Sequence, residues 1–271
     1  MRGSGRGRCY GAITIVSALA TGKGCALGVD LPVTAEVRLE EGKFRKKDFV
    51  DLCVAEVFSH YSVEYMPRVT IASAIPPSRG LKSSSAVANA VIMATAYALG
   101  ERLESEEILR MNVAASRKAG VSITGALDDA AASLFGGLVF TDNREDILLK
   151  REPFPPDYIC VLFIPKEECP TRSFLPRLEF IRKFSQIMDF VYSLADQGNI
   201  FEAMTLNGLV YSPLLGFSTD LMLMAMAAGA DASSLSGTGS AVAALVSNRH
   251  VDEVILAWGK GMKVNIRRGV E

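Results

Sequence analysis

Residues 83–99 form the stretch that most restricts how this chain can fold. They read SSSAVANAVIMATAYAL, a run of small and apolar residues without a charged side chain, and Gly100 follows. Such a run predicts a helix, and a glycine directly after it is typical of a helix C-terminus. Because no face of this helix carries charge, we expect it to be buried on all sides. The rest of the chain must therefore cover it.

The composition provides enough apolar material to build such a core. Of the 271 residues, 49% are hydrophobic and 22% are charged, which excludes a disordered chain. At ~150 residues per domain, this length predicts one large domain or two smaller ones. The chain has 29 Lys and Arg residues against 30 Asp and Glu residues, a net charge of −1. This balance favours small molecules over nucleic acid as partners.

The cysteines indicate a reducing compartment. They number five, an odd count, and none forms a CxxC pair. This pattern fits neither a disulfide framework nor a zinc site, so we predict a cytoplasmic protein. The basic start MRGSGRGR and the apolar residues 13–20 imitate a signal peptide, but Thr14 and Ser17 interrupt the apolar run. MRGSGRGR is then either an added leader or a flexible arm. No stretch has the ~20 predominantly apolar residues of a membrane span.

Strand and helix signals mix in both halves of the chain. Strands are predicted at residues 10–20, 33–40, 63–75, 138–141, 158–164, 241–246 and 263–267, and helices at 48–59, 83–99, 105–118, 128–135, 179–197, 200–211, 219–228 and 251–258. Ser105 is the expected cap of its helix. The proline-dense stretch REPFPPD, residues 151–157, predicts a boundary or connector. We therefore expect an α/β or α+β protein with domains 1–150 and 151–271.

The segment PPSRGLKSSSA, residues 76–86, is the best candidate for binding phosphate. A predicted strand ends at its prolines, and Gly80 precedes the serines that open the uncharged helix. The first N–H groups of a helix have no partner inside it and favour an anion. The hydroxyls of residues 83–85 can bond phosphate oxygens or a magnesium ion, and Arg79 and Lys82 add positive charge. Alternatively, the first serine is only a helix cap and the others pack.

Two further segments carry residues suited to chemistry. In SLSGTGSAV, residues 234–242, glycines alternate with hydroxyl residues, so the backbone amides can follow a phosphate or substrate. In TGALDDAAASLFGG, residues 124–137, Asp128 and Asp129 open an otherwise apolar helix. One acid is explained as a helix cap, whereas a second, near a phosphate site, could accept a hydroxyl proton or hold a lysine or magnesium. Neither a Walker A nor a dinucleotide-binding glycine motif is complete.

Together the three segments resemble the GHMP kinases, the superfamily of galactokinase, homoserine kinase, mevalonate kinase and phosphomevalonate kinase. The residues that match its phosphate-loop motif P-x-x-x-G-L-x-S-S-x-A are Pro76, Gly80, Leu81, Ser83, Ser84 and Ala86. SGTGS, residues 236–240, resembles the C-terminal glycine motif, and Asp129 lies seven residues before Gly136, as the family's acid does. The stretches GAITIVSALATGKGCALGVDLPVTAEV, GLKSSSAVANA and TGALDDAAAS are most similar to the archaeal-type shikimate kinases.

This resemblance implies a fold and a reaction. The fold would be α+β with two domains, an N-terminal ribosomal-protein-like α/β domain and a C-terminal ferredoxin-like domain, with ATP and substrate between them. The reaction would transfer the γ-phosphate of ATP to the 3-hydroxyl of shikimate with Mg²⁺, giving shikimate 3-phosphate and ADP. We expect a monomer or homodimer that binds neither nucleic acid nor membrane.

The resemblance also implies roles for individual residues. Asp129 would orient or deprotonate the attacking hydroxyl, with Asp128 as the second candidate acid. Lys82 stands where many relatives have glycine and would contact phosphate or substrate directly. The residues expected to bind ATP are Pro76, Arg79, Gly80, Leu81, Lys82, Ser83, Ser84, Ser85 and Ala86. Those expected to bind the acceptor are Lys23, Thr124, Arg144, Gly237, Thr238 and Gly239, and Mg²⁺ is expected at Ser84 and Asp129. The carboxylate of shikimate needs a cation, for which Arg79, Arg117, Lys118 and Arg144 are candidates.

Two other functions remain open from the sequence. A sister kinase would share the phosphate loop and act on homoserine, mevalonate or another small alcohol. An RNA-binding module would use the ribosomal-protein-like topology and the basic arm MRGSGRGR, although the charge balance weighs against it.

Overall fold

The first half of the chain builds a five-stranded antiparallel sheet. The computed structural model describes residues 3–169 and 171–269, without the side chains of 171–173. Strands β1 (Ser4–Val16) and β2 (Lys23–Glu40) form a long hairpin. The far end of β2 pairs with β3 (Met66–Ser73), and its near end pairs with β4 (Leu138–Asp142), which pairs with β5 (Ile147–Glu152). The strand β2 thus pairs with β1, β3 and β4.

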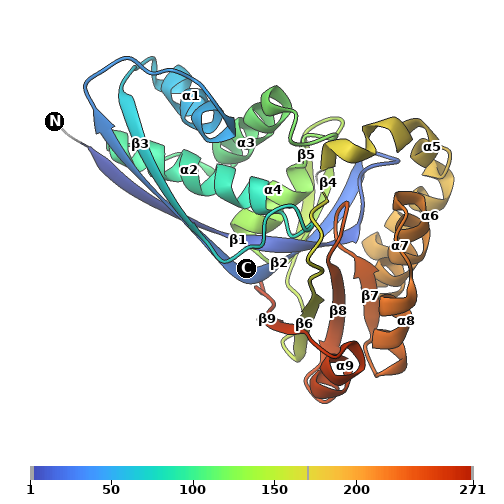
Figure 1. The fold of residues 1–271 in the computed structure, drawn as a ribbon. Helices are drawn as coiled ribbons and strands as arrows, with labels where there is room; N and C mark the ends of the chain where they lie inside the picture. Colours follow the sequence, from blue (N-terminus) through green and yellow to red (C-terminus); the bar gives the residue numbers. More distant parts are fainter. Residues whose placement is uncertain (1–2, 170, 270–271) are drawn as a thin grey trace.

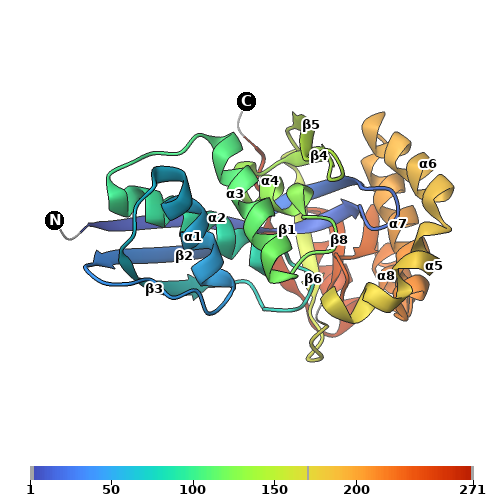
Figure 2. The ribbon, with the colours of Figure 1, turned by 90° about the horizontal axis from the view of Figure 1, so that it is seen from above.

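Four helices cover one face of this sheet (Figures 1 and 2). They are α1 (Phe49–Tyr61), α2 (Ser83–Leu99), α3 (Ser105–Ala119) and α4 (Leu127–Phe135). The uncharged helix α2 has the predicted bounds and lies against β1, with α1, α3 and α4 around it. Most of it is buried as predicted, but Val87 and Met93 are half-buried, Ser84 near the start is exposed, and Tyr97 near the end is 40% exposed.

Glycines on β1 let α2 lie directly on the sheet. Gly3, Gly5 and Gly7 alternate along the strand and therefore face the same side. A Cβ atom there would lie 1.8 Å from the carbonyl oxygen of Ala98, 2.2 Å from that of Ala94 and 2.1 Å from that of Ala90, respectively. From Ser4 onward, this basic stretch is the start of β1 and part of the core contact rather than a flexible arm.

The second half has the ferredoxin-like arrangement implied by the resemblance. Its strands are β6 (Tyr158–Phe163), β7 (Ala232–Leu235), β8 (Val242–Ser247) and β9 (Met262–Asn265), in the antiparallel order β7-β8-β6-β9. Its helical elements are the 3₁₀ helix η1 (Thr171–Arg177), α5 (Leu178–Arg182), α6 (Ser185–Asp196), α7 (Ile200–Leu215), α8 (Asp220–Ala227) and α9 (Val251–Trp258). The predicted α+β class is confirmed, and the division at residue 150 stays a prediction.

Several predicted element bounds were wrong. The glycine-rich residues 21–28 are largely strand, because β2 begins at Lys23. The helix predicted over 179–197 is broken between α5 and α6. Glu104, not Ser105, is the N-cap of α3, where its side chain and that of Glu107 form a capping box. Strand β5 was not predicted.

The tip of the β1–β2 hairpin connects the two halves. The backbone N–H of Ser17 donates to Asn207 Oδ1 at 2.8 Å, and that of Ala20 donates to the Tyr211 hydroxyl at 3.1 Å. Both acceptors are buried side chains of α7. Figure 1 shows the hairpin reaching across to the helices of the second half. Among residues 3–169 and 171–269, no helix combines the length and apolar character that crossing a bilayer requires.

The glycine contact predicts that Gly5→Ala destabilises the protein. The added methyl group would lie 2.4 Å from the backbone nitrogen of Ala98 as well as close to Ala94, so strand and helix must separate. We expect a loss of about 1–3 kcal/mol in the free energy of unfolding, measured by urea denaturation.

Arg6→Ala is the matched control on the same strand. Its side chain is 71% exposed, so we expect a change within about 0.5 kcal/mol. Equal stability of the two variants would contradict the packing role of Gly5.

Candidate active site

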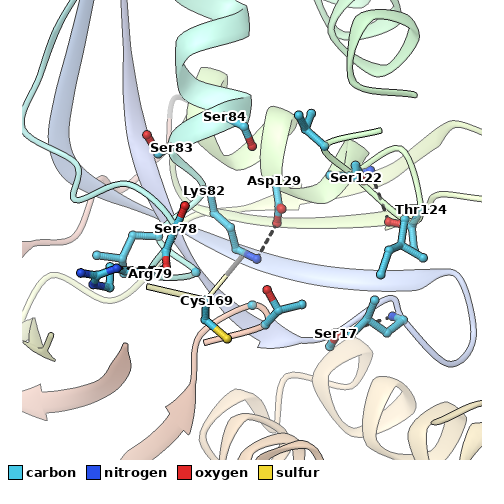
Figure 3. Close-up of a pocket in the computed structure, with 18 of the residues that line it drawn as sticks. Ser17, Ser78, Arg79, Lys82, Ser83, Ser84, Ser122, Thr124, Asp129 and Cys169 are labelled. Atoms are coloured by element: carbon cyan, nitrogen blue, oxygen red, sulfur yellow. Dashed lines mark hydrogen bonds and ion pairs between the residues drawn. The ribbon is translucent and has the colours of Figure 1, made fainter. Parts of the chain in front are cut away.

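A cavity of about 340 Å³ lies where the phosphate-loop segment, the start of α4 and the second half meet. Figure 3 shows side chains from these elements pointing into the same space. The cavity is lined by Ser17, Ala18, Leu19, Pro77, Ser78, Arg79, Gly80, Leu81, Lys82, Ser83, Ser84, Gly120, Val121, Ser122, Ile123, Thr124, Ala126, Asp128, Asp129, Cys169, Gly237 and Thr238.

The phosphate-loop segment leaves the N-terminus of α2 open. Ser78, Gly80 and Lys82 all have positive φ angles, of 53°, 76° and 63°. Lys82 is the N-cap residue, and its side chain makes no capping hydrogen bond to α2. Ser83 is the first helical residue rather than the cap. Among the side chains that the structure describes, none accepts from the first N–H groups of α2 at the cavity edge, which favours an anion there.

The two glycine-rich segments hold one another. The Ser236 hydroxyl donates to the Gly80 carbonyl at 2.8 Å and accepts from the Thr14 backbone N–H at 3.3 Å. The backbone N–H of Gly237 donates to Thr14 Oγ1 at 2.9 Å. A Cβ on Gly80 would lie 1.9 Å from the Ser236 carbonyl oxygen, so only glycine fits this approach.

Lys82 and Asp129 form an ion pair inside the cavity. Lys82 Nζ lies 2.8 Å from Asp129 Oδ1, and the two side chains are 7% and 18% exposed (Figure 3). Within the described part of the chain, no hydrogen bond from another group reaches that oxygen. Burial raises the pKa of Asp129 to about 6, against the lowering effect of the Lys82 charge, and Asp128 adds to the rise. Such a carboxylate is poised to accept a proton near neutral pH.

Asp128 points elsewhere and holds the loop before α4. Asp128 Oδ1 accepts from Asn143 Nδ2 at 2.8 Å, and the same amide nitrogen lies 3.2 Å from Thr124 Oγ1. Gly24 on β2 makes room, because a Cβ there would lie 2.6 Å from Asp128 Oδ2. Adjacent acids on a helix point in different directions, and here only Asp129 meets the lysine.

Most of the predicted site residues line this one cavity. Those brought together are Arg79, Gly80, Leu81, Lys82, Ser83, Ser84, Thr124, Asp128, Asp129, Gly237 and Thr238. Those outside its lining are Pro76, Ser85, Ala86, Lys23, Arg144 and Gly239.

The residues outside the cavity have other surroundings. Ser85 and Ala86 are buried in the core of α2. Gly239 packs against the Phe217 ring, where a Cβ would lie 2.7 Å from it. Lys23 Nζ lies 5.8 Å from the centre of the Tyr192 ring. Arg144 lines a neighbouring cavity.

Arg79 reaches the cavity but is engaged with a segment of the second half. Its Nε donates to the Pro165 carbonyl at 3.0 Å, its Nη2 donates to the Lys166 carbonyl, and Nη1 lies 3.8 Å from Glu168 Oε1. The sequence does not predict that residues 165–168 or the lining residue Cys169 lie at this site, because their contacts join distant parts of the chain.

Comparison with known proteins agrees with this architecture. Residues 49–137 match the model of the GHMP kinases N terminal domain, and residues 190–264 match that of the GHMP kinases C terminal domain. The chain resembles a homoserine kinase from Cytophaga hutchinsonii with a TM-score of 0.77 at 18% identity, covering 99% of this chain and 96% of that one. It resembles the Methanococcus jannaschii mevalonate kinase with a TM-score of 0.77 at 14% identity, covering 97% and 98%. These likenesses confirm the predicted fold.

Curated relatives are much more similar in sequence. The chain is 41% identical to a protein of Methanothrix thermoacetophila named shikimate kinase, over 98% of this chain and 94% of the relative. It is 38% identical to one of the same name from Pyrococcus furiosus, over 96% and 97%. The chain therefore belongs to the GHMP kinase family and, within it, to the archaeal shikimate kinases.

Proposed function

We propose that this chain is an ATP-dependent shikimate kinase that transfers the γ-phosphate of ATP to the shikimate 3-hydroxyl, giving shikimate 3-phosphate and ADP. The observation that carries the proposal is the Lys82–Asp129 pair beside the open N-terminus of α2. Phosphoryl transfer needs positioning and neutralisation of charge more than a covalent nucleophile. The names of relatives about 40% identical support shikimate as the acceptor.

The phosphates of ATP would bind at the start of α2. We assign them the free N–H groups of the helix and the hydroxyls of Ser83 and Ser84, with the backbone of Gly80 nearby. The C-terminal glycine motif supports this loop from the other side through Ser236. The side chain of Arg79 then acts by fixing the loop rather than by contacting phosphate, since its donors are engaged.

Asp129 would accept the proton of the 3-hydroxyl as the phosphoryl group is transferred. The nearby Lys82 ammonium group both stabilises the ionised carboxylate and can neutralise charge on the transferred phosphoryl group. Gly237 leaves space for it, because a Cβ at that position would lie 3.1 Å from Lys82 Nζ. Asp128 would serve by holding Asn143 and Thr124 in place.

A magnesium ion fits these residues as a companion of ATP. In the ranges that the structure covers, no group of three or more His, Cys, Asp or Glu side chains could hold a metal alone. Mg²⁺ usually keeps waters and takes one or two carboxylates plus substrate phosphates. Ser84 and Asp129 would supply the protein oxygens, and the ion would neutralise phosphate charge.

We also propose a cytoplasmic location. The five cysteines are free, and Cys9, Cys25, Cys53 and Cys160 are buried. This use of cysteine suits a reducing compartment. Whether the enzyme is a monomer or a homodimer stays a prediction.

A panel assay tests the acceptor. ADP release is measured with ATP and Mg²⁺ in the presence of shikimate, homoserine, mevalonate or no acceptor. We expect turnover with shikimate alone. Turnover with another alcohol would support the sister-kinase alternative, and RNA binding that weakens with salt would support the RNA-binding alternative.

Substituting each of the two acids separately distinguishes their roles. We expect Asp129→Asn to lower kcat by about 10²- to 10⁴-fold, because the proton acceptor is lost. Asp128→Asn keeps an oxygen for Asn143 and should mainly lower stability, by about 1–3 kcal/mol. Steady-state kinetics and thermal unfolding measure the two effects. A larger loss of kcat in Asp128→Asn would reverse the assignment.

The pH dependence of kcat/KM tests the ion pair. Because Asp129 must be ionised to accept a proton and its pKa is about 6, we expect the rate to fall as the pH drops through about 6. Lys82 lowers that pKa, so Lys82→Met should move the acidic limb of the profile to higher pH.

Lys263→Met is the control for this experiment. Lys263 is exposed on β9 and pairs with Asp252, 2.6 Å away, outside both cavities. Its profile should match that of the wild type. If the acidic limb does not move in Lys82→Met, the ion pair with Lys82 is not what lowers the pKa of Asp129.

A further inference from the structure

A second cavity, of about 220 Å³, adjoins the first one. The two share Ala18 and Leu19 of the hairpin tip and Ile123 and Thr124 of the loop before α4. The second cavity is therefore the continuation of the catalytic cavity away from the phosphate loop. Its lining differs in charge, because it contains three arginines and no acidic residue.

One of these arginines is already neutralised. Arg117 Nη1 and Nη2 lie 2.6 Å and 2.7 Å from the two carboxylate oxygens of Asp146, and Nη2 also donates to the Asn143 carbonyl at 3.2 Å. It also packs against Gly125, where a Cβ would lie 2.9 Å from Arg117 Nη2. Its donors are engaged in shaping the wall of the cavity.

The other two carry charge without an acidic partner. Arg144 follows β4, and its stem packs on Gly22, where a Cβ would lie 2.5 Å from Arg144 Cγ. Its Nη2 only approaches the Ala20 carbonyl, at 3.5 Å. Arg182 is the last residue of α5 and is exposed. Across residues 3–169 and 171–269, neither guanidinium forms an ion pair.

Two guanidinium groups without an acidic partner at one small cavity favour an anion. Arginine presents a planar fork of donors that matches a carboxylate, and such charge-assisted pairs are about twice as strong as neutral hydrogen bonds. The two groups come from opposite halves of the molecule, Arg144 from the first and Arg182 from the second. A carboxylate between them would bridge the halves.

We propose that Arg144 and Arg182 together bind the carboxylate of the acceptor. The proposal rests on the proposed function, since it gives the acid shikimate its second point of attachment. In shikimate the carboxylate and the 3-hydroxyl sit on ring carbons separated by one carbon. An acceptor whose hydroxyl reaches Asp129 past Thr124 therefore directs its carboxylate into the adjoining cavity. Arg182 is then a specificity residue, and not one of the groups that transfer the phosphate.

The test pairs a protein change with a ligand change. Arg182→Ala and Arg144→Ala should each raise the KM for shikimate by about 10- to 100-fold, the size of a lost charged hydrogen bond, while the KM for ATP changes less than about twofold. Shikimate methyl ester, which lacks the negative charge, should be a poor acceptor for the wild type. Arg182→Ala should discriminate far less between acid and ester, and Arg182→Lys should recover part of the difference.

Lys183→Ala is the matched control. It removes a positive charge from the next residue, which is exposed and lines neither cavity. Its KM values should equal those of the wild type, and melting temperatures should show that all variants fold.

Two results would overturn the proposal. One is an unchanged KM for shikimate in Arg182→Ala, and the other is an equal rise for the acid and its ester. A wild-type enzyme that ignores shikimate but phosphorylates homoserine or mevalonate would instead overturn the proposed function, and the same comparison with that acid and its ester or amide would then decide the arginine proposal.

Discussion

The contact between the backbones of α2 and β1 is the constraint on which the rest of the structure depends. At Gly3, Gly5 and Gly7 the strand has no side chain facing the helix, so there the carbonyl groups of α2 approach the strand backbone directly. The same contact continues to the start of the helix, where the Ala12 N–H approaches the Leu81 carbonyl at 3.4 Å. The position of the phosphate loop is therefore determined by the packing of a core helix and not by the loop alone.

The geometry of helix α4 gives the two adjacent acids different surroundings. Helix α4 places Asp128 against Gly24 and Asn143, and it places Asp129 against Lys82. Two carboxylates that look alike in sequence are thus given different partners by helix geometry, Asn143 for Asp128 and Lys82 for Asp129. The division depends on Gly24, since a larger residue would push Asp128 and the start of α4 away from the sheet.

Local patterns in the sequence predicted the parts of the site that depend on neighbouring residues. The bounds of α2 followed from its uncharged run and Gly100. The residues alone left Asp128 and Asp129 equivalent, and only the resemblance selected Asp129, the acid that meets Lys82. The resemblance to a family supplied the domain architecture. The N-cap of α3 shows the limit, because local preference favours Ser105, whereas the structure uses Glu104 in a capping box with Glu107.

Contacts between distant residues could not be predicted in the same way. The sequence gives no sign that Arg79 is engaged by carbonyls 86 and 87 residues away, or that Gly239 faces Phe217. Nothing in the sequence around Arg182 connects it with residues 76–86 or 124–137. Only the folded chain brings such residues to one place.

The hairpin tip depends on residues from far along the chain. Ser17 is bonded by a residue 190 positions later in the chain, and Ala20 by one 191 positions later. During synthesis the first sheet can form long before α7 has emerged, since domains fold largely as units from the N-terminus. The cavity wall at residues 17–19 can therefore be bonded to α7 only after most of the chain has been made. Before then, the nascent chain has residues 76–86 but lacks the α7 side chains that hold the opposite wall.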